Sequence, residues 1–295
     1  MPMDVPIRRM SGARSRSHLA RGRWHVARST SAARSTSHVA RRTWIFLLFA
    51  VASAGCDIVT ADHRYQETAE WRKSYELAPG GRVEVINING QIQVEPASGN
   101  TLEVVALKTA RGNSPEDAKR ALERLEVAEK SNAGTIRIET RYERSGWFGP
   151  SAHVRYTIRL PKDANARFVT TNGGVELRGV SGTLEAQSTN GGIVARDVGG
   201  SFSATTTNGG VDVDMSHLGE GGARFQCTNG GVRLRLPSDA KATISATVTN
   251  GGIDTGNLPL ETTESSRRRL EARLNGGGAP VRMSCTNGGL SIHGR

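Results

Sequence analysis

The chain has 295 residues, with 39 lysines and arginines against 28 aspartates and glutamates, so its formal net charge is +11. Most of the excess lies in residues 1–55, which carry ten arginines and one acid, whereas residues 56–295 carry 29 basic and 27 acidic side chains. The remainder has neither a basic groove nor an interleaved set of aromatic residues. We therefore expect no nucleic-acid partner.

The first segment, residues 1–43, is rich in arginine and serine and has too few apolar residues to fold. It contains a duplication, because the stretch Ser11–Trp24 returns at Ser31–Trp44. The segment is predicted to be a disordered basic extension. It either binds a membrane surface or results from an assigned start that lies too far upstream, with Val39 as the alternative start.

Residues 44–55 form an apolar run of twelve residues that ends in small side chains before Cys56. As a helix the run would span about 18 Å, short of the roughly 30 Å of a bilayer core, which is typical of an export signal. The sequence Ser53-Ala54-Gly55-Cys56 resembles a bacterial lipoprotein signal, although that motif usually has leucine where Ser53 stands. The resemblance implies lipidation of Cys56 and attachment to a membrane; either general secretion or twin-arginine export is compatible with Arg41-Arg42.

The next two segments are a polar tether over residues 56–75 and a β-rich subdomain over residues 76–160. Asn89-Gly90 lies between alternating segments, as a hairpin signal and as a degenerate first copy of the corner motif described below. Ser114 followed by proline and two acids predicts the start of a short helix. Period-two alternation predicts strands over residues 135–142 and 153–160.

Residues 161–295 are organised by Thr-Asn-Gly-Gly, which returns with an apolar residue after it. Successive asparagines are 18, 18, 21, 21 and 37 residues apart, and the last step fits either two units or one unit with an insertion. A period of about 20 residues predicts a repeat architecture in which each coil stacks on the next. The predicted fold is all-β: a β-solenoid or β-roll with a smaller α+β N-terminal part. Its corners would be Asn172, Asn190, Asn208, Asn229, Asn250 and Asn287.

Aligning the asparagines predicts which positions face inward. The residues four and two positions before each asparagine, and three positions after it, are small or apolar, and they share the pattern of a buried column. We expect the asparagines to form an internal ladder that satisfies backbone groups at the corners. We also expect the coils to stack in sequence order, which places Cys227 and Cys285 two coils apart as buried, unpaired thiols.

The outward columns favour a structural role for their charges. In sequence order Asp212, Arg233 and Asp254 would alternate in sign across neighbouring coils, as would Asp214 beside Arg235. No cluster of carboxylates, and no histidine pair with metal-ligand spacing, is found among the repeats. We therefore predict no enzyme activity, no cofactor and no metal.

Two further groups are candidate partner contacts. Trp147 and Phe148 lie in a loop between strands, where packing against the adjacent sheet is the alternative interpretation. Arg267, Arg268 and Arg269 form a basic run that is either a solvated loop or a contact for anionic envelope polymers.

The order of Gly-Gly-Arg-Val-Glu-Val, Asn-Gly, a capped helix, two strands, Leu160-Pro161 and Asn-Gly-Gly repeats resembles a bacterial family of unknown function labelled "putative adhesin". The resemblance covers about residues 75–295. It implies a fold of β-strand repeats and has no catalytic residues to transfer.

These observations predict a non-catalytic lipoprotein of the cell envelope that presents a rigid β-repeat surface to a protein or a polysaccharide. It would be exported and lipid-anchored, facing the periplasm or the cell surface. Two alternatives stay open: a carbohydrate-active β-helix enzyme, and an ice- or surface-binding array of threonines, including Thr205 with Thr207 and Thr247 with Thr249.

Overall fold

The structure, a computed structural model, describes residues 65–78, 80–132, 134–143 and 150–295. The chain separates into two units, Met1–Cys56 and Asp57–Arg295, and every described residue belongs to the second. The predicted leader, the signal segment, Cys56, Trp147 and Phe148 lie outside the described residues. No helix in the described part is long and apolar enough to cross a membrane.

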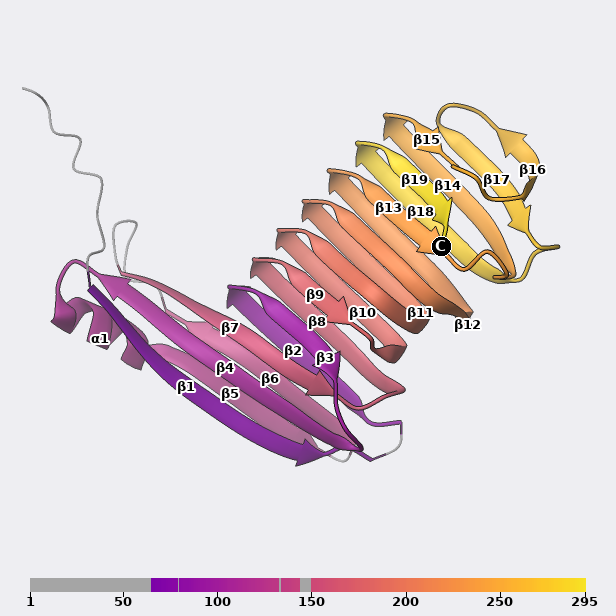
Figure 1. The fold of residues 1–295 in the computed structure, drawn as a ribbon. Helices are drawn as coiled ribbons and strands as arrows, with labels where there is room; N and C mark the ends of the chain where they lie inside the picture. Colours follow the sequence, from indigo (N-terminus) through magenta and orange to yellow (C-terminus); the bar gives the residue numbers. More distant parts are fainter. Residues whose placement is uncertain (1–64, 79, 133, 144–149) are drawn as a thin grey trace, which may run out of the picture. The chain divides into compact units, whose positions relative to one another are not determined.

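The repeats form a β-solenoid, as predicted (Figure 1). Strands that precede the corners pair in parallel in one row, which we call the pre-corner row, and strands that follow the corners pair in a post-corner row. The pre-corner row contains, in spatial order, β2 (Arg82–Asn89), β8 (Ala164–Asn172), β10 (Ser181–Asn190), the second halves of β11 (Ile193–Asn208) and β12 (Val211–Asn229), β18 (Ala279–Asn287) and β14 (Ala242–Asn250). The post-corner row contains β3 (Ile92–Pro96), β9 (Val175–Arg178), the first halves of β11 and β12, β13 (Val232–Leu236), β19 (Leu290–Gly294) and β15 (Ile253–Asp254).

Further strands extend both rows beyond β2 and β3, and they extend the pre-corner row beyond β14. Next to β2 and β3 the added strands are β6 (Thr135–Tyr142), β5 (Leu125–Asn132), β7 (Ser151–Leu160), β4 (Thr101–Gly112) and β1 (Tyr65–Glu76). Next to β14 they are β17 (Arg269–Leu274) and β16 (Leu260–Ser265). The predicted helix is α1 (Pro115–Glu123), and its N-cap Ser114 accepts a hydrogen bond from the Asp117 N–H at 3.1 Å.

The core lies between the two rows and is built from the predicted inward columns. All residues four positions before the corner asparagines are buried, from Phe168 to Met283. The residues three positions after the asparagines are also buried, except Ile253, which is partly exposed in the last coil of the row. Phe202 and Phe225 meet edge to face, with ring centroids 5.8 Å apart. Because each coil has only a narrow apolar interior, it is stable only when stacked on its neighbours.

The stacking order of the last two coils differs from the prediction. The strand β18 pairs with β12 on one side and with β14 on the other, and β19 likewise lies between β13 and β15 (Figure 1). The C-terminal coil is therefore inserted between two coils that precede it in the sequence. The 37-residue step is one unit with an insertion, namely the hairpin β16–β17.

The hairpin explains this insertion. Strand β17 pairs antiparallel with one edge of β14, so only the opposite edge is free for β18. The connection passes the start of β14 at Gly278, where an added Cβ would lie 2.5 Å from the carbonyl oxygen of Lys241. Asn275 anchors the turn by donating its amide to the carbonyls of Ser238 and Ala240, at 2.8 and 2.9 Å.

Asn89-Gly90 forms a coil corner and not a hairpin. Strands β2 and β3 pair with β8 and β9 instead of with each other. The interpretation as a first copy of the corner motif is confirmed, because Asn89 is in register with Asn172.

Candidate functional site

The corner asparagines form an unbroken ladder along the solenoid. The side-chain amide of each asparagine after Asn89 donates to the side-chain oxygen of the asparagine in the neighbouring coil, at 2.7 to 2.9 Å. The amide of Asn89, at the end of the ladder, donates to the carbonyl oxygen of Ala152 at 3.2 Å. In spatial order the ladder is Asn89, Asn172, Asn190, Asn208, Asn229, Asn287 and Asn250. The six asparagines from Asn172 to Asn287 are exposed, so the prediction of an internal ladder is wrong. Each asparagine is the last residue of its strand and the chain bends at the glycine that follows, so the asparagine lies outside although the positions two and four residues before it face the core.

Side chains two positions before the asparagines, and not the asparagines themselves, donate to the corner carbonyls. Ser188 and Thr206 donate to the carbonyl oxygens of Gly173 and Gly191, both at 2.8 Å. Cys227 donates through its thiol to Gly209 at 3.2 Å. Each acceptor belongs to the first glycine of the neighbouring corner, so this inner column joins one coil to the next.

The first glycine of each corner is required by the close approach of the coils. At Gly209, with φ +154°, an added Cβ would lie 2.3 Å from the carbonyl oxygen of Gly191. The second glycine has a different role, because it faces outward. At Gly210 an added Cβ would be 3.6 Å from the nearest atom, an ordinary contact.

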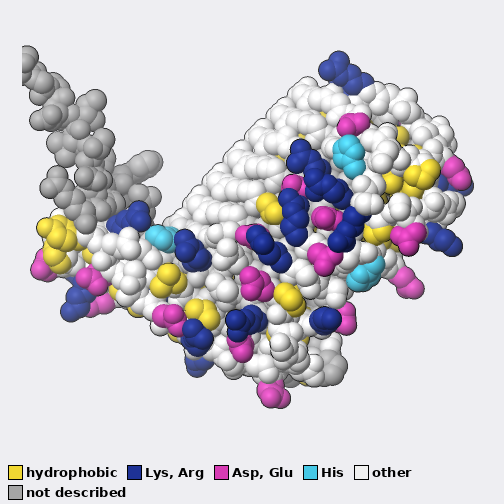
Figure 2. All heavy atoms as spheres, viewed as in Figure 1, with side chains coloured by type: hydrophobic (Ala, Val, Ile, Leu, Met, Phe, Trp, Pro, Cys, Tyr) yellow, Lys and Arg dark blue, Asp and Glu magenta, His cyan; other side chains and the backbone are white. Residues whose placement is uncertain are grey.

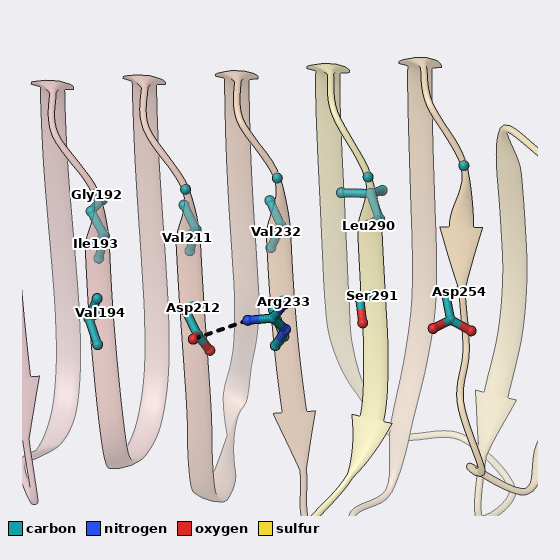
Figure 3. Close-up of a pocket in the computed structure, with 14 residues that line it drawn as sticks. Gly192, Ile193, Val194, Val211, Asp212, Val232, Arg233, Asp254, Leu290 and Ser291 are labelled. Atoms are coloured by element: carbon teal, nitrogen blue, oxygen red, sulfur yellow. Dashed lines mark ion pairs between the residues drawn. The ribbon is translucent and has the colours of Figure 1, made fainter. Parts of the chain in front are cut away.

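The outward-facing second glycines form the floor of a shallow groove of about 630 Å³ that crosses five neighbouring coils (Figure 3). Along this corner groove lie the residues four positions after each asparagine. The lining residues include Gly192, Gly210, Gly231, Gly289, Gly252, Val194, Asp212, Arg233, Ser291 and Asp254. Sequence reasoning missed this groove. The sequence does contain a signal for it. The second glycine lies two residues before the outward position that follows it on the strand, so it faces outward too and leaves a gap there because it has no side chain.

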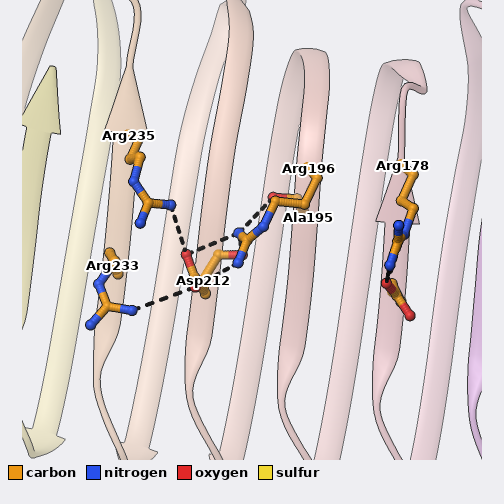
Figure 4. Close-up of polar contacts among 7 residues, drawn as sticks. Arg178, Ala195, Arg196, Asp212, Arg233 and Arg235 are labelled. Carbon is orange, nitrogen blue, oxygen red and sulfur yellow. Dashed lines mark hydrogen bonds and ion pairs between the residues drawn. The ribbon is translucent and has the colours of Figure 1, made fainter. Parts of the chain in front are cut away.

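Asp212 is the centre of a charged cluster beside the groove (Figure 4). Arg196 donates to both of its carboxylate oxygens, at 3.0 and 2.7 Å, while Arg233 and Arg235 lie 3.5 and 3.4 Å away. The hydrogen bond from Arg196 is the main cause that holds the pKa of Asp212 below its usual value, and the same bond raises the pKa of Arg196. Asp212 therefore stays ionised and is a structural partner of the arginines, not a general acid.

The predicted alternation of charge is only partly correct. Arg233 is in register with Asp212 on one side, but its other neighbour is Ser291, which separates it from Asp254. Asp214 is in register with Arg235, yet it forms an ion pair with Arg295, at 3.5 Å. Figure 2 shows basic and acidic side chains intermingled over this face, next to a strip without charged side chains.

A second charged cluster lies on the pre-corner row. Glu84 accepts from Arg137 at 2.6 Å and from Arg167 at 2.8 Å. Burial tends to raise the pKa of Glu84, but the two arginines outweigh it and lower this pKa. Among the described carboxyl groups with a shifted pKa, which are Glu84, Glu129 and Asp212, all are shifted downward.

Ser291, His293 and Asp254 come together at the end of the groove, a group that sequence reasoning missed. The hydroxyl of Ser291 lies 2.5 Å from Nε2 of His293, and a carboxylate oxygen of Asp254 lies 3.6 Å from the same nitrogen. A catalytic triad needs the serine and the acid on opposite ring nitrogens. With both partners on the same ring nitrogen, Asp254 cannot orient His293 as a base for Ser291.

The predicted arginine run lies at the tip of the hairpin β16–β17. Arg267, Arg268 and Arg269 are exposed, and Arg269 is paired with Glu264 at 2.9 Å and with Glu271 at 3.4 Å. Among the described residues, no three histidine, cysteine, aspartate or glutamate side chains gather to hold a metal ion.

The predicted threonine array is interrupted. Thr205 has Gln187 and Gln226 as its register neighbours, and Thr247 lies beside Ser284. The two threonine pairs therefore do not form one continuous surface.

The structure is a β-solenoid scaffold: its parallel coils stack through repeated corners, and many outward-facing charged side chains form ion pairs with one another. The chain belongs to the Toastrack DUF4097 family, which it matches over residues 82–293. A comparison with curated proteins found no match.

Solved structures similar to this chain include a "putative cell adhesion protein" from Clostridium sporogenes, with 11% identity and a TM-score of 0.45, covering 78% of this chain and 100% of that one. A "putative adhesin" from Bacteroides fragilis has 8% identity and a TM-score of 0.29, covering 77% and 97%. A "putative adhesin" from Parabacteroides distasonis has 10% identity and a TM-score of 0.28, also covering 77% and 97%.

Proposed function

We propose that this protein is a non-catalytic lipoprotein of the cell envelope that recognises an extended polar polymer through the corner groove. The observation that carries the proposal is the groove itself, which crosses five coils with a glycine floor and has Asp212, Arg233, Ser291 and Asp254 among its lining residues. Ligand sites are concave and place a few polar groups around an open floor. The polymer is a polysaccharide or a segment of another envelope protein.

The groove suits a linear ligand because its chemistry repeats with the coils. Along its length the polar wall alternates between Asp212, Arg233, Ser291 and Asp254. Such a wall offers donors and acceptors to hydroxyl or amide groups at each step. The rigid stacking of the coils means that little side-chain order has to be created on binding, which favours affinity.

The absence of catalysis is inferred from the ion pairs. Glycoside hydrolysis needs one carboxyl group that is protonated at neutral pH. The lowered pKa of Asp212 works against that role, and the Ser291 group lacks the geometry of a nucleophile with its base. Export and anchoring through Cys56 are inferred from the sequence of residues 44–56.

The groove is tested by filling its floor. Gly210→Gln places a side chain in the groove at a position where a Cβ makes only ordinary contacts, and Gly174→Gln changes the same column in a coil that does not line the groove. Both changes are made in the Cys56→Ala protein, which is incubated with cell-wall polysaccharide and with envelope protein fractions and then sedimented. We expect Gly210→Gln to lower binding at least tenfold and Gly174→Gln to retain it. Equal binding by both variants, or no binding by the parent, would contradict the proposal.

A further inference from the structure

Cys227 and Cys285 are direct neighbours in the pre-corner row. They are register partners in the parallel strands β12 and β18, although they lie 58 positions apart in the sequence. The expectation that Val248 separates them is wrong, because Val248 pairs with the far side of Cys285. Both thiols are free in this structure and both side chains are buried, with 5% and 4% exposure.

The spacing of these strands is within the reach of a disulfide. Neighbouring strands lie about 4.8 Å apart, and bridged cysteines have Cα atoms about 4.4 to 6.8 Å apart. The thiol of Cys285 already points toward the coil of Cys227, since it lies 3.9 Å from the carbonyl oxygen of Gly230. The thiol of Cys227 points the other way, toward Gly209. A rotation about its Cα–Cβ bond would bring the two sulfurs together, and bond formation would remove both weak S–H hydrogen bonds, to Gly209 and to Gly230.

The hydrogen bond to the corner glycine does not require a cysteine. Thr206 and Ser188 make the same bond in the neighbouring coils, at a shorter distance. In this column, the two cysteines occupy adjacent coils only because the C-terminal coil is inserted out of sequence order. What a pair of cysteines adds at these two positions is the capacity to be joined covalently.

We propose that Cys227 and Cys285 form a disulfide that fastens the C-terminal coil, β18 and β19, to the coil of β12. The proposal rests on the proposed export, because disulfides persist in oxidising compartments. The bridge would close a loop that contains β13 to β17 and would hold the inserted coil in place between β12 and β14.

The oxidant is a disulfide, either a small one such as oxidised glutathione or a protein disulfide donor. One cysteine thiolate attacks it and forms a mixed disulfide with release of one thiol; the second thiolate then displaces the other thiol and leaves the Cys227–Cys285 bond. The two cysteines are oxidised, and the donor is reduced to two thiols. Burial, followed by the neighbouring Cys285, raises the pKa of Cys227 to about 12 in the folded protein. The exchange therefore takes place during folding, before the C-terminal coil closes over the thiols.

The test uses the full chain, unfolded in reductant and refolded with oxidised and reduced glutathione. After alkylation and digestion, we expect mass spectrometry to find a peptide that links Cys227 to Cys285. We also expect the oxidised protein to unfold several degrees above the reduced protein. The control is Cys227→Thr with Cys285→Thr, which uses the residue found in this column at Thr206, and its unfolding temperature should not respond to reductant.

The proposal is overturned if protein that has regained its β-sheet circular dichroism contains both cysteines in alkylated form, or if either is linked to Cys56. Because the refolding is done in vitro, it does not depend on export. A bridge that forms in vitro but is missing from protein isolated from cells would contradict the export part of the proposed function and leave the pairing intact.

Discussion

The amide of Asn287 donates to the side-chain oxygen of Asn229 at 2.9 Å, although Asn250 is the next corner asparagine along the chain. Asn250 in turn donates to Asn287 at 2.8 Å. The ladder thus follows the spatial order of the coils and not their order in the sequence. It continues through the inserted coil because every corner presents the same amide at the same register.

The ladder should contribute measurably to stability. Asn208→Ala removes one donated and one accepted side-chain hydrogen bond, and at about 1 kcal/mol each the free energy of unfolding should fall by about 2 kcal/mol. Asn208→Asp is the matched variant, since it still accepts from Asn229 but no longer donates to Asn190. It should lose about half as much in urea unfolding at neutral pH. An unchanged urea midpoint for the alanine variant would show that water replaces these exposed hydrogen bonds without loss of stability.

The two glycines of one corner should differ sharply in their tolerance of alanine. In Gly209→Ala the new Cβ would lie 2.3 Å from a backbone oxygen of the adjacent coil, so the coils must separate locally. We expect a loss of roughly 3 kcal/mol or more, at the upper end of single-substitution effects. Gly210→Ala, with 3.6 Å of clearance, should change the free energy of unfolding by less than about 0.5 kcal/mol. Thermal unfolding followed by circular dichroism measures both, and similar losses would contradict the assigned roles.

Asp212 should contribute to acid unfolding. Its folded-state pKa is lowered, chiefly by Arg196, so its stabilising contribution is fully present above the unfolded value of about 4 and is lost as the pH falls toward the folded pKa. The wild-type protein should therefore lose more stability between about pH 5 and pH 2.5 than Asp212→Asn, which has no charge to lose. Urea midpoints of both proteins, measured across this pH range, show which of the two loses more stability. A steeper loss in the asparagine variant would contradict it.

Anchoring is predicted to depend on Cys56. A thioether-linked diacylglyceryl group and an added acyl chain together give stable attachment, whereas a single chain holds a protein only weakly. Cys56→Ala should move the protein from the membrane pellet to the soluble fraction, or leave it as an uncleaved precursor. Cys227→Ala is the control, because it changes a buried core thiol and should remain in the pellet. Identical fractionation of Cys56→Ala and the parent protein would rule out the lipoprotein assignment.

The local pattern of the sequence predicted the coil. Alternation around Thr-Asn-Gly-Gly placed Phe168, Ala186 and Phe225 in the core, and the helix signal at Ser114 marked the N-cap that the structure shows. These features depend on backbone geometry over a few residues, where the strand period and the freedom of glycine act directly. The same alternation also predicts that the second glycine of each corner faces outward, which indicates the floor of the corner groove.

Tertiary structure alone decided the order of the coils. The corners of Asn229, Asn250 and Asn287 have the same motif, and Val248, Cys227 and Cys285 all fit the same narrow column, so their side chains do not specify which coils are neighbours. The hairpin β16–β17 decides this by occupying one edge of β14 and leaving the other for β18. The outward direction of the asparagines was decided in the same way. A ladder of amides forms only between coils in contact, and it lies outside because each asparagine ends its strand at the corner, just before the glycine where the chain bends.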